Sequence, residues 1–109
     1  MLAGAALFTL KASAQLAPPR IALQARKFAY LPVEIHTVVG RPITLAITSL
    51  DYAHAVGIPD FGERADCVPG REVALTFTPE KIGHFTIVCD NFCGAGHDDM
   101  CASQVVTSV

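Results

Sequence analysis

Residues 72–89 read E-V-A-L-T-F-T-P-E-K-I-G-H-F-T-I-V-C and contain two runs in which apolar and polar side chains alternate. Successive side chains of a β-strand point to opposite faces, so each run predicts a strand with one buried face. The apolar residues of each run fall on one side of its predicted strand: Val73, Leu75 and Phe77 in the first, Phe85 and Ile87 in the second.

The same pattern continues on both sides of these two runs. Alternating segments occur at 21–25, 33–38 and 43–48, and further short strands are predicted at 54–58 and 104–109, with Gly and Pro in several of the connections. Helical periodicity is absent. About eight short strands at close spacing predict an all-β fold, a Greek-key β-sandwich or barrel.

Length and charge narrow the function classes. A chain of 109 residues is expected to form one domain with one site. It contains no Gly-rich phosphate loop and no nucleophile turn, which argues against nucleotide-binding proteins and serine hydrolases. The sequence pI of about 6.0 and the absence of a basic aromatic stripe argue against nucleic acid as a partner.

The N-terminal residues have the pattern of a signal peptide. Residues 1–10 are an apolar run, and Ala12-Ser13-Ala14 supplies the small-x-small pattern of a cleavage site. We therefore predict a signal peptide over 1–14, a Pro-containing linker over 15–19 and the folded domain over 20–109. The run is shorter than the ~20 residues that span a bilayer, so we expect a periplasmic or otherwise exported protein with no transmembrane segment in the mature chain.

The residues with metal-binding chemistry are concentrated in one loop, 89–100, which reads C-D-N-F-C-G-A-G-H-D-D-M. Two thiols, an imidazole and a thioether form a soft ligand set, which suits copper better than magnesium or calcium, and the thioether disfavours zinc. A further imidazole is available from His54, at the start of another predicted strand. The candidate side-chain ligands are therefore His54, Cys89, Cys93, His97 and Met100.

The number of thiols bears on the number of metal ions. A mononuclear blue-copper site uses two His, one Cys and a weak axial Met, so a second Cys is surplus. Two copper ions bridged by Cys89 and Cys93 would use it. The alternatives are a structural disulfide between these cysteines, and roles for Met100 and His54 in ordinary core packing. His36 and His84 fall on the polar faces of their strands, so we expect both to be exposed.

The loop pattern C-x3-C-G-x-G-H-x2-M, with the distant His54, resembles the CuA domain of cytochrome c oxidase subunit II. Phe28-x-Tyr30-x-Pro32, Val68-Pro69-Gly70-Arg71 and Gly83-His84-Phe85 also resemble segments of that family. The resemblance implies a cupredoxin fold and the five side-chain ligands above, and it adds the backbone carbonyl of Asn91 as a sixth ligand.

The resemblance also implies a function. It predicts a two-copper, CuA-type centre that accepts and donates single electrons, in a domain that is not an enzyme on its own, with oxidase subunit I or a c-type cytochrome as partner. The alternative is a periplasmic protein that stores or delivers copper. The copper domain of a nitrous oxide reductase is less favoured, because the accompanying catalytic domain is absent from this sequence.

Three departures from the family separate this chain from a typical subunit II. The sequence has no two-helix membrane hairpin and no Trp, and it has Asn91 where many subunits II carry a Glu. The absence of that acid makes the resemblance closer to the ba3-type oxidases.

Two further expectations concern charge and the remaining thiols. Residues 46–109 carry three basic and nine acidic side chains, which predicts a cationic partner such as a basic c-type cytochrome. Asp51, Asp90, Asp98 and Asp99 are candidates either for docking that partner or for simple loop solvation.

Because an exported protein meets an oxidising compartment, we also predict a Cys67–Cys101 disulfide, with two unpaired thiols as the alternative.

Overall fold

The computed structural model describes residues 17–90 and 100–108 and is a sandwich of two β-sheets. Nine strands lie within these residues: β1 (Arg20–Arg26), β2 (Ala29–Leu31), β3 (Glu34–Val38), β4 (Ile43–Ser49), β5 (His54–Ile58), β6 (Glu63–Cys67), β7 (Val73–Phe77), β8 (Gly83–Val88) and β9 (Cys101–Thr107). A single 3-10 turn, η2 (Pro59–Phe61), links β5 to β6 within this part of the chain. The predicted all-β class is confirmed.

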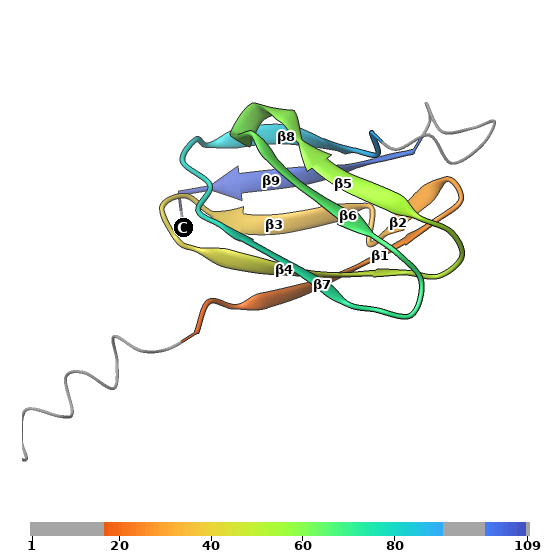
Figure 1. Cartoon of the computed structure of the whole chain (residues 1–109). Coiled ribbons are helices and arrows are strands. Elements are labelled where there is room, and N and C mark those ends of the chain that lie inside the picture. The colour runs from red at the N-terminus through yellow and green to blue at the C-terminus, as the bar shows by residue number, and fades with distance from the viewer. Residues whose placement is uncertain (1–16, 91–99, 109) are drawn as a thin grey trace, which may run out of the picture.

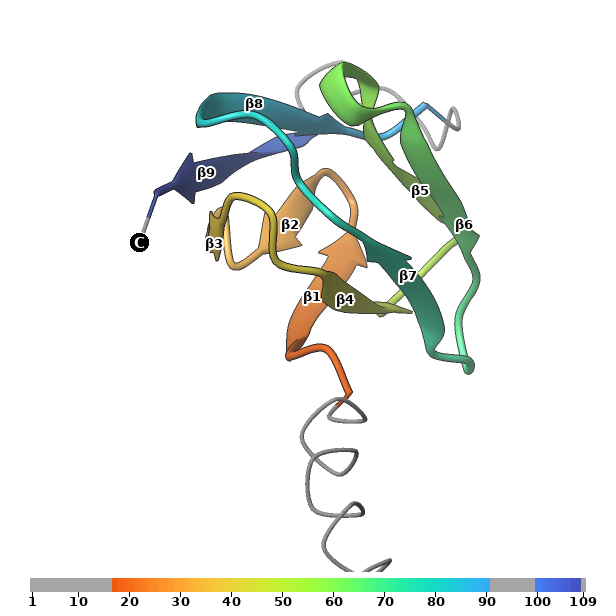
Figure 2. The ribbon, with the colours of Figure 1, turned by 90° about the vertical axis from the view of Figure 1, so that its left-hand side faces the viewer.

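The two sheets have the strand orders β2-β1-β4-β7 and β3-β9-β8-β5-β6. The pairs β1–β4 and β3–β9 are parallel, and the other pairs are antiparallel. Figure 2 shows β8 and β9 on one side of the core and β1 and β4 on the other. Since parallel neighbours cannot be joined by a hairpin, the chain crosses between the sheets to build them.

The core lies between the sheets and is filled by the inward-facing residues that alternation predicted. Leu45, Ile47 and Ile87 are fully buried, while His36 and His84 are exposed as expected. The strand β4 differs from the prediction because its outward residues Thr44 and Ala46 are also buried. A side chain of the neighbouring strand contributes on this face, since the Thr44 and Thr76 hydroxyls are hydrogen-bonded at 2.8 Å.

Two strands and one boundary were not predicted. β2 is only three residues long, too short to show a period, and β6 is an edge strand with mostly polar residues. The last strand starts at Cys101, directly after Met100, rather than at residue 104. This earlier start matters for the site, because it places Met100 at the very end of the loop. The predicted signal peptide and residues 15 and 16 of the predicted linker fall outside the described residues.

Candidate metal centre

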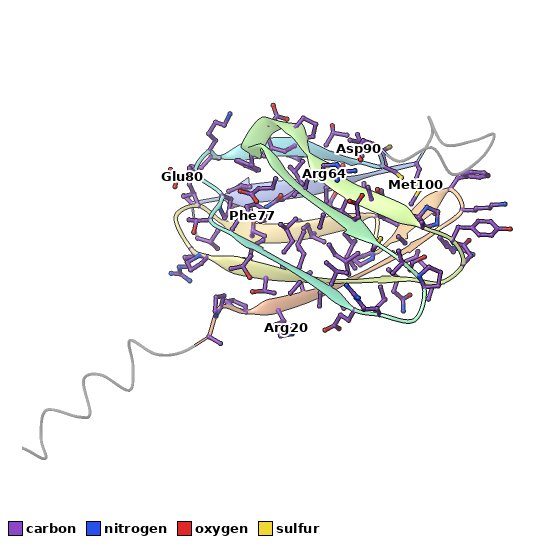
Figure 3. All side chains as sticks on the ribbon, viewed as in Figure 1. Arg20, Arg64, Phe77, Glu80, Asp90 and Met100 are labelled. Atoms are coloured by element: carbon purple, nitrogen blue, oxygen red, sulfur yellow. The ribbon has the colours of Figure 1, made fainter. Side chains whose placement is uncertain are left out.

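Three of the predicted ligands converge at one end of the larger sheet. His54 begins β5, Cys89 directly follows β8, and Met100 directly precedes β9. The strands β9, β8 and β5 are neighbours in that order, so the three residues come from adjacent strands. This is the right-hand end in Figure 1, and Figure 3 labels Met100 there. A sheet thus brings together residues that lie far apart in the sequence.

The His54 ring is completely buried, and only one of its nitrogens is satisfied. Its Nε2 lies 2.7 Å from Asp51 Oδ1, whereas Nδ1 is buried without a hydrogen-bond partner among the described residues. A buried polar atom without a partner is costly, and a metal ion is one way to satisfy it.

Asp51 determines which tautomer His54 adopts. Partial burial acts to raise the pKa of Asp51, but hydrogen bonds from the Lys27 amide, the His54 ring and the Tyr52 amide outweigh it and lower the pKa to about 2. The carboxylate is therefore ionised at neutral pH and can only accept hydrogen bonds. Nε2 must carry the proton that it donates to Asp51, which leaves the lone pair of Nδ1 free to bind a metal.

The Cys89 thiol faces the interior and is held by the start of β5. Its side chain is 5% exposed, and the backbone N–H of Ala55 donates to Sγ at 3.4 Å. The Tyr30 hydroxyl donates to the Ala55 carbonyl at 2.5 Å. Burial, and next the adjacent Cys89 thiol, raise the pKa of Tyr30 far above its usual range, so the phenol stays neutral. The sequence analysis included Tyr30 in a motif but assigned it no role.

Met100 is 2% exposed and belongs to the hydrophobic core. A thioether needs no hydrogen bond, so burial alone is compatible both with core packing and with a metal-ligand role. Asn91, Cys93 and His97 lie outside the described residues, as do Asp98 and Asp99. Within 17–90 and 100–108, no group of three or more His, Cys, Asp or Glu side chains is arranged to hold a metal ion.

The predicted Cys67–Cys101 disulfide is wrong, because both cysteines are free thiols. Cys67 is buried on β6, where it pairs with His54 of β5, while Cys101 is exposed at the start of β9. In their sheet β8 and β5 separate these two strands, and three strand spacings amount to about 14 Å. A disulfide requires Cα atoms within about 7 Å. Burial raises the pKa of the Cys67 thiol.

Several large apolar side chains are exposed around this end. Of the exposed large apolar side chains among the described residues, all but Ile82 lie in or beside the links at this end: Leu31, Val33, Leu50, Tyr52 and Val68. The Lys27 ammonium lies 4.2 Å from the centre of the Tyr52 ring. Asp51 and Asp90, by contrast, are engaged within the protein, Asp51 with His54 and Asp90 with Arg64. We refer to these five side chains as the apolar patch; exposed apolar groups can add contact area at a protein interface.

The chain is similar to one family along most of its length. The profile of "Cytochrome C oxidase subunit II, periplasmic domain" matches residues 9–109. The alternative cytochrome c oxidase subunit 2 of Bradyrhizobium diazoefficiens is 32% identical over 73 residues, which cover 67% of this chain and 26% of that protein. Cytochrome c oxidase subunit 2 of Thermus thermophilus is 30% identical over 79 residues, covering 72% and 58%. The chain thus spans between a quarter and three fifths of these relatives.

Solved structures agree with the fold. The periplasmic domain of subunit II of cytochrome oxidase of Bradyrhizobium japonicum superposes with a TM-score of 0.75 at 23% identity, covering 84% of this chain and 85% of that one. A chain of a heme-copper terminal oxidase dimer superposes with a TM-score of 0.72 at 29% identity, covering 83% and 65%. These similarities confirm the predicted cupredoxin-like fold. No helix among the described residues is long and apolar enough to cross a bilayer.

Proposed function

Because this chain belongs to the family of the periplasmic domain of cytochrome c oxidase subunit II, we propose that it is an electron-transfer domain with a two-copper, CuA-type centre. The observation that carries the proposal is the His54 ring, which is buried, fixed in one tautomer by Asp51, and left with an unpartnered Nδ1. An imidazole nitrogen held in this state, near a buried thiol, is a suitable ligand for a copper ion.

The proposed ligands are His54 through Nδ1, Cys89, Cys93, His97, Met100 and the backbone carbonyl of Asn91. In the sequence, Cys89 and Met100 flank residues 90–99, which contain the other three proposed ligands. The second thiol favours two copper ions over one, because a mononuclear site with two His and one Met has no use for it.

Such a centre would supply one-electron chemistry, and the described residues would keep its ligands fixed and exclude water from them. His54, Cys89 and Met100 are anchored at the ends of three adjacent strands, which resist movement when the charge of the site changes. Asp51 accepts a hydrogen bond from the His54 ring, and the Ala55 amide donates one to the Cys89 sulfur. The burial of all three side chains excludes water from this side of the site.

For partners we propose a donor with a cationic surface, such as a basic c-type cytochrome, and oxidase subunit I as acceptor. The acidic C-terminal part of the chain supports the first, and the family supports the second. The apolar patch around the site would contribute contact area that charge does not. We also propose that the chain is exported, with residues 1–14 as its leader.

Copper storage or delivery remains the second candidate, and the geometry favours it less. A delivery protein needs exposed ligands that exchange readily, whereas His54, Cys89 and Met100 are buried. Buried ligands with fixed outer partners favour retention of the metal.

The test is electron paramagnetic resonance of the copper-loaded protein. We expect two copper ions per chain and a seven-line hyperfine pattern from one unpaired electron shared by both, which Cys89→Ser abolishes. The proposal would be overturned by a four-line pattern at one copper per chain. Ready transfer of the copper to a weak chelator would favour the storage and delivery alternative.

A further inference from the structure

Outside the core, a cluster of polar side chains is centred on Arg64 of β6. Its guanidinium donates to Asp90 from Nε at 2.6 Å and from Nη2 at 2.8 Å, and to Asp66 from Nη1 at 3.1 Å and Nη2 at 2.8 Å. Both carboxylates are thus bound through two hydrogen bonds each, the strongest and most directional form of this contact. Figure 3 shows Arg64 and Asp90 side by side on the outer face of the larger sheet.

The Arg64 side chain reaches Asp90 by crossing a whole strand. Gly57 of β5 pairs with Arg64 on one side and with Val88 of β8 on the other. A Cβ at Gly57 would lie 3.7 Å from Asp90 Oδ2 and 3.6 Å from the Val88 carbonyl oxygen. A side chain longer than a methyl group would therefore fill the space through which the guanidinium and the carboxylate meet. The glycine leaves this passage open.

The contact lies just beyond the last residue of β8. β8 pairs with β9 through six residue pairs that end at Val88, but with β5 through the single pair Gly57–Val88. Cys89 and Asp90 follow immediately after the last residue of β8. The bidentate contact at Asp90 therefore restrains the chain directly after the strand, next to Cys89.

Cys89 and Asp90 are adjacent and point to opposite faces. Cys89 points into the core, where the Ala55 amide donates to its sulfur, and Asp90 points out to Arg64. Alternation along an extended chain links the two directions, so fixing the outward side chain also fixes the inward one. We propose that Arg64 is a positioning residue for the Cys89 sulfur, which it orients through Asp90 across Gly57. This inference rests on the proposed function only in that Cys89 is taken as a copper ligand.

The position of these groups argues against a general role in stability. The side chains of Arg64, Asp66 and Asp90 are 46%, 66% and 44% exposed, and exposed ion pairs contribute little to folding. We expect these groups to act on the position of the metal ligand instead. Removing an outer partner that orients a metal ligand typically lowers metal affinity about 10- to 100-fold.

The experiment compares Arg64→Gln with Arg20→Gln. Arg20 forms an ion pair with Glu72 of similar exposure on the other sheet, which makes it a matched control. In the copper-loaded protein we expect Arg64→Gln to raise the rate of copper loss to a Cu(I) chelator about tenfold. We expect Arg20→Gln to match the wild type. Arg64→Lys keeps the charge but cannot bind both carboxylates bidentately, so it should resemble Arg64→Gln.

A second readout needs no copper. In the reduced, metal-free protein, the Ala55 amide reports on the Cys89 sulfur, so Arg64→Gln should shift its NMR resonance and speed its hydrogen exchange while the melting temperature stays close to that of Arg20→Gln. An Ala55 amide unchanged in Arg64→Gln, or full recovery by Arg64→Lys, would overturn the inference. A wild-type protein that binds no copper would overturn the proposed function, while the Ala55 amide would still test the positioning role.

Discussion

Asp51→Ala is the substitution that most directly tests the geometry of the site. Asp51 accepts hydrogen bonds from the Lys27 amide at 2.8 Å, the Tyr52 amide at 2.6 Å and His54 Nε2 at 2.7 Å. The two amides are near the surface, where water can replace the carboxylate. His54 is completely buried, so its Nε2 would lose its partner without such a replacement. We therefore expect the metal-free protein to lose about 1–3 kcal/mol of stability.

For a domain of this size, each kcal/mol lowers the melting temperature by about 4–8 °C. The assay is thermal unfolding of the reduced, metal-free protein, together with ¹⁵N NMR of the His54 ring. In the wild type we expect the proton on Nε2, and in Asp51→Ala we expect a mixture of tautomers. Asp60→Ala, at an exposed position in η2, is the control. If both variants melt together and the wild-type tautomer persists in Asp51→Ala, then Asp51 does not fix the ring.

Three further outcomes are expected. A short treatment of the folded, reduced protein with iodoacetamide should modify Cys101 rapidly and Cys67 slowly, since Cys101 is exposed and Cys67 is buried with a raised pKa; equal rates by mass spectrometry would contradict the burial of Cys67. Because its pKa is raised in the folded protein, Tyr30 should ionise only in the unfolded chain at pH values above the unfolded pKa of about 10. The stability of the wild type should therefore fall more steeply with pH than that of Tyr30→Phe, by up to about 1.4 kcal/mol per pH unit. Stabilities of the two proteins that change in parallel from pH 8 to 11, measured by urea unfolding, would refute this. Association with a basic c-type cytochrome should slow as salt rises; a rate independent of ionic strength would leave the apolar patch as the main docking contact.

Several features could be predicted from local sequence because they depend on short-range chemistry. Alternation in 72–89 identified β7 and β8, since the period of a strand is visible within a few residues. The same rule correctly placed His36 and His84 at the surface. The composition of the 89–100 loop indicated a soft metal, because ligand type alone restricts the choice. β2 and β6 were missed, since one is too short and the other too polar for a period to emerge.

The tertiary structure decided what depends on distance between segments. Cys67 and Cys101 looked like partners in the sequence, yet two intervening strands keep them apart. The proton position on His54 follows from Asp51, whose ionisation depends on amides of two separate segments. Arg64 meets Asp90 only because Gly57 leaves the strand between them uncovered. The sequence alone determined which residues could bind a metal, and strand order determined which of them meet, because pairing between distant segments leaves no local pattern to detect.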